Sequence, residues 1–273
     1  MKWKLILPIT IIIVIILGLL CYIRAIVKAN IANGCQGINA WLTKHCRDQA
    51  ILHSANYPWT EKLRSNWHVI RDEFDAYHRT HEIPAYADIN MGSSGATKGW
   101  KALFLRAFCN NTEMMARFPK TKAIIDSIKR GTTECTTAYF SMLEPGTRIA
   151  EHRGIYKGVI RYHLGLYVPQ KWEDCFIVVD GMKMHWREGQ DIMFDDMYFH
   201  HVQNNTTERR VVLFLDIRRD FQSSVINAIN GCLLRNIKSN DELLSTIEKA
   251  NILSARTKRD DHQSNYMDTR ESF

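Results

Sequence analysis

The chain has 273 residues, 45% of them hydrophobic, which is enough for one large domain and excludes a chain that is disordered throughout. Lysine and arginine number 36 against 29 aspartate and glutamate, giving a net charge of +7 and favouring anionic neighbours such as phospholipid headgroups or small acidic ligands. We expect no nucleic-acid partner, because the basic residues are dispersed and form no known nucleic-acid motif. The seven cysteines include no CxxC pair, which argues against a disulfide framework.

The N-terminal segment is apolar enough to cross a membrane. Residues 5–23 read LILPITIIIVIILGLLCYI, close to the ~20 apolar residues that a membrane-spanning helix needs. We therefore predict a single-pass anchor within residues 1–30. The competing interpretation is a cleaved signal peptide, but the apolar run exceeds the usual length of about 7–15 residues and no A-x-A-like site follows it. Lysine or arginine flanks both ends, so charge does not decide the orientation.

The next segments favour helices. Residues 31–54 form a polar connector, and residues 57–78 then place apolar side chains three and four apart, as in an amphipathic helix; these are Trp59, Leu63, Trp67, Ile70 and Phe74. A second helix is predicted over residues 119–130, with Pro119 in its first turn and Gly131 after its end.

From residue 135 the period changes to two. Short strands are predicted in CTTAYFSML, GVIRYHLGLYV, CFIVVD, MKMHW, DIMFDD and RRVVLFLDIR, separated by Pro-Gly, Asp-Gly and Glu-Gly turns. This pattern predicts a mainly β domain, a jelly roll or barrel, with helices before it that cover one sheet. We place this domain at residues 55–219, two C-terminal helices at 220–256 and a solvated tail at 257–273.

Charged side chains in these strands are the candidate functional residues. Arg161 and His163 lie two apart and share a face, and alternation allows only one of His200 and His201 to point inward. With inward phasing, the barrel interior receives His152, Arg161, His163, His200 and Arg210. Two neutral imidazoles suit Fe(II), and two guanidinium groups suit a dicarboxylate such as 2-oxoglutarate. A lone histidine or arginine in a strand is more often a surface or core residue, so alternation alone does not identify a reaction.

The order of motifs carries a resemblance to a known family. SMLEPGTRIAEHRG, RYHLGL, WREGQDIMFDDMYFHHV and ERRVVLFLDI resemble the aspartyl/asparaginyl β-hydroxylase family of Fe(II)/2-oxoglutarate-dependent dioxygenases over residues 55–219. The resemblance implies a double-stranded β-helix, a cupin-like jelly roll. It also implies that His152 and His200 bind iron, that Ser141 and Arg210 hold the distal carboxylate of 2-oxoglutarate, and that Arg161 and His163 contact the cosubstrate near its chelating end.

Gly154 stands where most related oxygenases carry a carboxylate ligand, two residues after the first histidine. The resembled family also lacks this carboxylate, which implies that a water takes the position and that Asp196 orients it. The competing interpretations are a turn role for Asp196 and a site that binds no iron. Glu151 and Tyr198 are further candidates, each with a structural alternative.

The acceptor is expected to be the acyl chain of a membrane lipid. The stretches YPWTEKLRSNWHVIRDE, HRGIYKGVIRYHLGL and CFIVVDGMKMHWREG look similar to the branch of the family that hydroxylates lipid A or ornithine lipids. Apolar residues in GWKALFLRAF and FDDMYF would line an acyl groove, although core packing explains them equally well. We expect a catalytic domain that faces the cytoplasm, where iron and 2-oxoglutarate are available. The resemblance implies O2 as a further cosubstrate. The alternatives are a protein aspartyl/asparaginyl β-hydroxylase and a catalytically inactive membrane-anchored binding module.

Overall fold

The computed structural model describes residues 35–47, 49–89 and 97–257 of the chain. Its helices are α2 (Gln36–Thr43), α3 (Trp59–Ser65), α4 (Trp67–His78), α5 (Tyr86–Ile89), α6 (Pro119–Asp126), α7 (Ser224–Lys238) and α8 (Asp241–Ser254). Its strands are β1 (Ile51–Leu52), β2 (Trp100–Ala107), β3 (Asn110–Asn111), β4 (Cys135–Leu143), β5 (Arg148–His152), β6 (Val159–Tyr167), β7 (Cys175–Val179), β8 (Met182–His185), β9 (Asp191–Phe194), β10 (His200–Asn204) and β11 (Arg210–Arg218).

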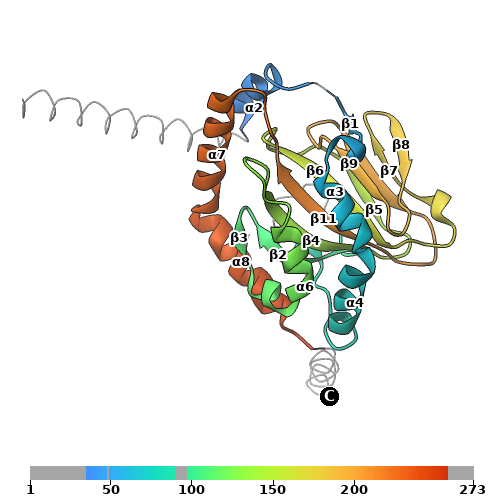
Figure 1. Ribbon diagram of the computed structural model, residues 1–273. Helices are drawn as coiled ribbons and strands as arrows, with labels where there is room; N and C mark the ends of the chain where they lie inside the picture. The colour runs from blue at the N-terminus through green and yellow to red at the C-terminus, as the bar shows by residue number, and fades with distance from the viewer. Residues whose placement is uncertain (1–34, 48, 90–96, 258–273) are drawn as a thin grey trace, which may run out of the picture.

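The strands form two antiparallel sheets that pack as a sandwich (Figure 1). The seven-stranded sheet has the order β1-β9-β6-β11-β4-β2-β3, and the four-stranded sheet has the order β5-β10-β7-β8. From β4 onwards the chain passes repeatedly between the two sheets. Apolar side chains of both inner faces meet in one buried cluster, which includes Ile177 of β7, Val202 of β10 and Phe214 of β11. The prediction of a mainly β domain with flanking helices is confirmed.

Helices cover the outer face of the seven-stranded sheet. Alternation in β11 directs Val211 and Leu213 into a cluster with Phe74 of α4, while Phe214 faces the other sheet. Buried residues of α3 and α6 join the same cluster. Each side chain of the central strands is therefore committed either to the helix layer or to the space between the sheets, where the candidate site lies.

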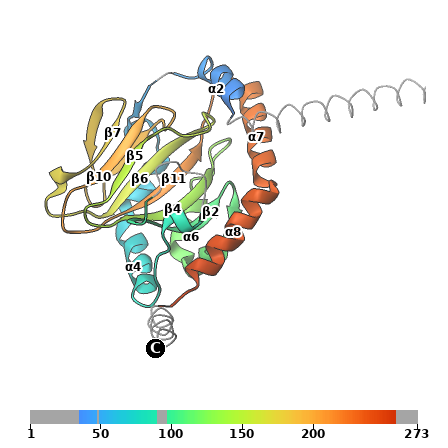
Figure 2. The same cartoon turned by 180° about the vertical axis from the view of Figure 1, so that it is seen from behind.

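The helix predictions hold with one correction. The single helix expected over residues 57–78 is two helices, because Asn66 leaves the helical conformation with φ −111° and ψ 15°. Its side-chain amide donates to the carbonyl of Lys62 at 2.8 Å. Helix α6 begins at Pro119 as predicted, and α7 and α8 are the two expected C-terminal helices. Figures 1 and 2 show α7 and α8 along one side of the sandwich.

The predicted anchor at residues 5–23 and most of the tail at 257–273 lie outside the described residues. Within the described part of the chain, we find no helix with the length and apolar character that crossing a bilayer requires. The six cysteines in that part are all free thiols.

Candidate active site

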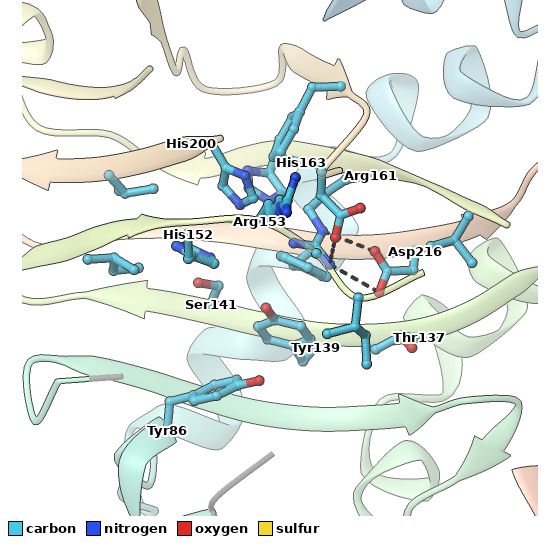
Figure 3. A pocket seen from close by; sticks show the side chains of 18 of the residues that line it. Tyr86, Thr137, Tyr139, Ser141, His152, Arg153, Arg161, His163, His200 and Asp216 are labelled. Atoms are coloured by element: carbon cyan, nitrogen blue, oxygen red, sulfur yellow. Dashed lines mark hydrogen bonds and ion pairs between the residues drawn. The ribbon is translucent and has the colours of Figure 1, made fainter. Parts of the chain in front are cut away.

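A cavity of about 230 Å³ lies between the two sheets (Figure 3). Strands of both sheets and the turn between β9 and β10 supply its walls. All seven candidate residues named from the sequence line this one cavity; they are Ser141, His152, Arg161, His163, Asp196, His200 and Arg210. The fold therefore brings the whole predicted set together.

The two histidines expected to bind metal are direct cross-strand neighbours. His152 ends β5 and His200 begins β10, and the two residues are paired in the antiparallel ladder. Their ring centroids lie 4.3 Å apart, with an angle of 52° between the ring planes. His201 instead lies on the other side of β10, with its ring 6.5 Å from that of Phe176. The structure thus distinguishes the two adjacent histidines by the pleat of one strand.

Backbone carbonyls fix the tautomers of this pair. Nδ1 of His152 lies 2.9 Å from the carbonyl oxygen of Ala150, and Nδ1 of His200 lies 2.9 Å from that of Tyr198. A carbonyl only accepts, so each Nδ1 carries the proton and each Nε2 keeps its lone pair. Burial lowers the pKa of both imidazoles, that of His200 to about 3. Both rings are therefore neutral at pH 7, in the form that binds a metal ion.

A buried cation without a carboxylate partner occupies the deep end of the cavity. Arg210 is 1% exposed, and within the described residues it forms no ion pair. One of its terminal nitrogens donates to the backbone oxygen of Ser141 at 3.1 Å, and its guanidinium lies 4.4 Å from the ring centroid of Trp186. Its Nε has no hydrogen-bond partner. Burial lowers the pKa of Arg210, as expected for a cation without an anion nearby.

His163 shares this end of the cavity. It is 5% exposed, and neither of its ring nitrogens has a hydrogen-bond partner. Burial, followed by the charges of Arg210 and Arg161, holds its pKa well below the ordinary value. Since an unpaired buried polar atom costs about 1–3 kcal/mol, Arg210 and His163 together indicate space for a ligand that accepts hydrogen bonds.

Asp196 lies where a side chain at position 154 would be. An ideal Cβ built on Gly154 would come within 2.0 Å of Oδ2 and 2.5 Å of Oδ1 of Asp196. The Gly154 amide also donates to the backbone oxygen of Asp196, at 2.6 Å. Burial raises the pKa of the Asp196 carboxyl to about 6, and Oδ1 has no partner. A carboxylate from a different turn thus stands beside the position that related oxygenases fill from residue 154.

Arg161 is held between two carboxylates. Its guanidinium lies 2.8 Å from Oδ2 of Asp196. It also lies 3.0 Å from Oδ1 of Asp216, and Figure 3 shows this contact. Asp216 is the direct neighbour of Arg161 in the ladder between β6 and β11. Much of the hydrogen-bonding capacity that we assigned to the cosubstrate is therefore used within the protein. Arg161 orients Asp196, and its contact with a cosubstrate remains a prediction.

A second charged cluster that sequence reasoning missed supports the same turn. Asp195 is fully buried, and its Oδ2 lies 2.7 Å from Nζ of Lys157 and 2.7 Å from a terminal nitrogen of Arg219. The adjacent carboxylates of Asp195 and Asp196 therefore bind different cations. The only signal in the sequence was the doubled aspartate itself, because the partners come from distant segments.

The remaining candidates divide between site and surface. Glu151 is exposed, whereas Tyr198 lies in the wall of a neighbouring cavity and its backbone carbonyl accepts a hydrogen bond from the His200 ring.

The segment GWKALFLRAF contains strand β2, which the sequence analysis does not predict as a strand. Phe104 lines the central cavity, while Leu103 packs against the helices, so lining and core packing are both present.

These residues fit an iron ion and 2-oxoglutarate. The two free Nε2 lone pairs suit a borderline divalent metal, and the unpaired Arg210 with Ser141 suits the carboxylate of a dicarboxylate. Among the described residues, no set of three or more His, Cys, Asp or Glu side chains is arranged to hold a metal ion. An ion at this pair would therefore need ligands from water or the cosubstrate.

Comparison with known proteins points in the same direction. A family model described as Aspartyl/Asparaginyl beta-hydroxylase matches residues 64–220. The ornithine lipid ester-linked acyl 2-hydroxylase of Rhizobium tropici is 36% identical over 177 residues, covering 63% of this chain and 62% of that protein. The aspartyl/asparaginyl beta-hydroxylase of Homo sapiens is 27% identical over 161 residues, covering 58% of this chain and 20% of that protein.

The chain thus spans less than two thirds of the length of these relatives. Among solved structures, a cupin 2 conserved barrel domain protein from Salinispora arenicola CNS-205 is 12% identical with a TM-score of 0.28, covering 49% of this chain and 83% of that one. A likeness this slight adds nothing to the sheet topology.

Proposed function

The chain belongs to the aspartyl/asparaginyl β-hydroxylase family, and on that premise we propose that it is an Fe(II)- and 2-oxoglutarate-dependent dioxygenase that hydroxylates an acyl chain of a membrane lipid. The observation that carries the proposal is that one cavity is lined by the neutral histidine pair and by a buried arginine without a carboxylate partner. The passage of the chain between two sheets supports the double-stranded β-helix that the family implies. The similarity to the Rhizobium tropici ornithine lipid hydroxylase supports a lipid acceptor.

In the proposed reaction, one oxygen atom of O2 enters a C–H bond of the acceptor, and the other enters succinate as 2-oxoglutarate loses CO2. Iron, when bound, supplies the redox chemistry of this step. His152 and His200 would hold the ion through Nε2, and Arg210 with Ser141 would hold the far carboxylate of 2-oxoglutarate. Asp196, oriented by Arg161, stands in the space that a side chain at Gly154 would occupy, and there it would accept a hydrogen bond from a water bound to the ion.

The surroundings of the pair limit side reactions. Trp186 and Phe194 are buried beside His163, and Phe194 also packs against His200, so the protein places aromatic surface around the metal position. A dry wall of this kind strengthens the contact between Arg210 and a carboxylate.

We further propose that residues 5–23 anchor the chain in a membrane, with the catalytic domain on the cytoplasmic side. The apolar run in the sequence and the lipid-modifying relative support this arrangement.

Anaerobic titration of the full chain with Fe(II) and 2-oxoglutarate tests the proposal. We expect a metal-to-ligand charge-transfer absorption band that His200→Ala abolishes. His201→Ala is the matched control, because its ring lies on the other side of the same strand. With O2 and a lipid acceptor, mass spectrometry should find one added oxygen in an acyl chain. A band that survives His200→Ala would refute the ligand assignment, and modification of an Asp or Asn peptide alone would favour the protein-hydroxylase alternative.

A further inference from the structure

A second cavity, of about 750 Å³, adjoins the first on its outer side. Helix α2, the 153–157 loop after β5, the turn between β7 and β8, and the 197–199 turn form its walls. The two cavities share Arg153, Gly154 and Ile155. A group bound in this outer cavity would therefore lie next to the histidine pair, close enough to belong to the same acceptor molecule.

The outer cavity carries two opposite charges that lack ionic partners. Arg153 and Asp180 are both exposed, and neither forms an ion pair within the described residues. Arg153 lies 4.9 Å from the ring centroid of Phe199, and the backbone amide of Asp180 donates to the carbonyl of Phe199 at 2.9 Å. The other charged side chain in the wall, Lys157, is buried and paired with Asp195. One cation and one anion thus remain for a ligand.

Apolar side chains lie beside these charges. Ile155 is 59% exposed and Phe199 is 53% exposed, and both line the outer cavity. Large apolar side chains exposed beside a cavity commonly mark a ligand-binding groove. Charges of both signs next to such a surface match an amphiphile that has a zwitterionic headgroup.

Two hydrogen bonds with α2 hold the 153–157 loop, which forms one wall of the outer cavity. The side-chain amide of Asn39, on α2, donates to the carbonyl of Ile155 at 2.8 Å, and its oxygen accepts from the amide of Lys157 at 2.8 Å. Asn39 is itself 7% exposed. This pair of hydrogen bonds fixes the loop that carries Arg153, so the outer cavity exists before a ligand arrives and less ordering is required on binding.

We propose that the outer cavity is a headgroup subsite for a zwitterionic lipid. Arg153 binds the carboxylate or phosphate of the headgroup, Asp180 binds its ammonium, and Ile155 and Phe199 contact the first part of the acyl chain. The inference rests on the proposed lipid hydroxylation and narrows the acceptor class to lipids with both charges. Arg153 and Asp180 are positioning residues for this acceptor.

Binding to the full chain in nonionic maltoside micelles, without iron or 2-oxoglutarate, tests the subsite. The probe is Nα-dodecanoyl-lysine, which carries a carboxylate and an ammonium, and calorimetry measures its affinity. We expect Arg153→Gln to weaken binding about tenfold, the size of one charge-assisted hydrogen bond. The carboxamide of the probe should bind wild type and Arg153→Gln equally weakly. Arg153→Lys keeps the charge and should retain much of the affinity.

The anionic side chain of the subsite, Asp180, is tested separately. Asp180→Asn should weaken binding of Nα-dodecanoyl-lysine and leave the affinity for its Nε-acetyl derivative unchanged. Lys183→Gln is the matched control for Arg153→Gln. Like Arg153, Lys183 is an exposed cation that lies over an aromatic ring, at 3.8 Å from the centroid of Phe176, but it does not line the cavity. Lysophosphatidylethanolamine with the same chain distinguishes phosphate from carboxylate headgroups, and Nα-acetyl-lysine distinguishes a lipid from a small amino acid.

Equal affinity of wild type for the zwitterionic probe and both of its capped derivatives would overturn the subsite. The outcomes for the subsite and for the enzyme are separable. Binding that depends on Arg153 without any hydroxylated product would remove the proposed activity and leave the subsite. Hydroxylation of neutral and zwitterionic lipids alike, by wild type and Arg153→Gln, would remove the subsite and leave the activity.

Discussion

The carboxylate of Asp196 and the missing side chain of Gly154 claim the same space, since a Cβ on Gly154 would lie 2.0 Å from Oδ2 of Asp196. Gly154 therefore offers no side chain to a metal ion, and its lack of a side chain is also required for the packing of Asp196. A carboxylate cannot be restored at position 154 while Asp196 keeps its place beside Arg161.

Gly154→Ala should lower the free energy of unfolding by about 1–3 kcal/mol, the usual cost of overpacking, because the new Cβ displaces the Asp196 carboxylate. Asp196→Ala in the same chain should remove most of that cost, since the two positions are in contact. Urea unfolding of the wild type, both single variants and the double variant measures the coupling. Strictly additive costs would contradict the shared space.

Arg210→Met should weaken binding of 2-oxoglutarate at least about tenfold, because a charge-assisted contact is lost. The free energy of unfolding should stay constant or rise, since the substitution removes a buried cation that lacks a carboxylate partner. Calorimetry with Mn(II) and 2-oxoglutarate, together with urea unfolding, provides both readings. Arg209→Met is the control, as Arg209 is exposed on the adjacent position. Equal losses of affinity in the two variants would refute the assignment.

Asp195→Asn should destabilise the fold by about 3–5 kcal/mol, because Lys157 and Arg219 would be left buried without their carboxylate. Asp196→Asn should cost less, since Arg161 retains Asp216. Thermal and urea unfolding compare the two neighbours. Asp126→Asn, at an exposed ion pair, should change stability by less than about 1 kcal/mol. The expectation fails if Asp195→Asn and Asp126→Asn unfold alike.

Asn39→Ala should loosen the 153–157 loop, since two hydrogen bonds that hold it to α2 are lost. We expect faster trypsin cleavage after Arg153, mapped by mass spectrometry, and a loss of about 1–3 kcal/mol in unfolding free energy. Asn110→Ala is the control, because its amide also joins distant segments, donating to the carbonyl of Lys238 at 2.9 Å, but lies outside both cavities. Unchanged cleavage after Arg153 would show that α2 does not hold the loop.

Local patterning predicted much of the sandwich. The segment CTTAYFSML coincides with β4, and the inward phasing correctly placed Arg210 in the cavity. These features depend only on neighbours along the chain. The break at Asn66 was not visible, because the apolar spacing continues across it.

The contacts of the site were less accessible, because they depend on strand register. Arg161 meets Asp216 only through the pairing of β6 with β11, and His152 meets His200 only through that of β5 with β10. That Asp195 and Asp196 bind different cations was also not predictable, because those cations come from segments that only the fold brings to the turn after β9. The sequence motifs named the residues of the cavity, whereas their partners came from the fold.

The placement of β5 has a consequence for exchange of the metal. In the smaller sheet β5 is a terminal strand, hydrogen-bonded to β10 on one side, and it supplies one of the two histidines. Edge strands open more readily than central ones, so fraying of five residues would detach one ligand while the helix-covered sheet stays folded. In the proposed enzyme, loading and release of the ion would follow local opening of β5, with the second imidazole left in place on the inner strand β10.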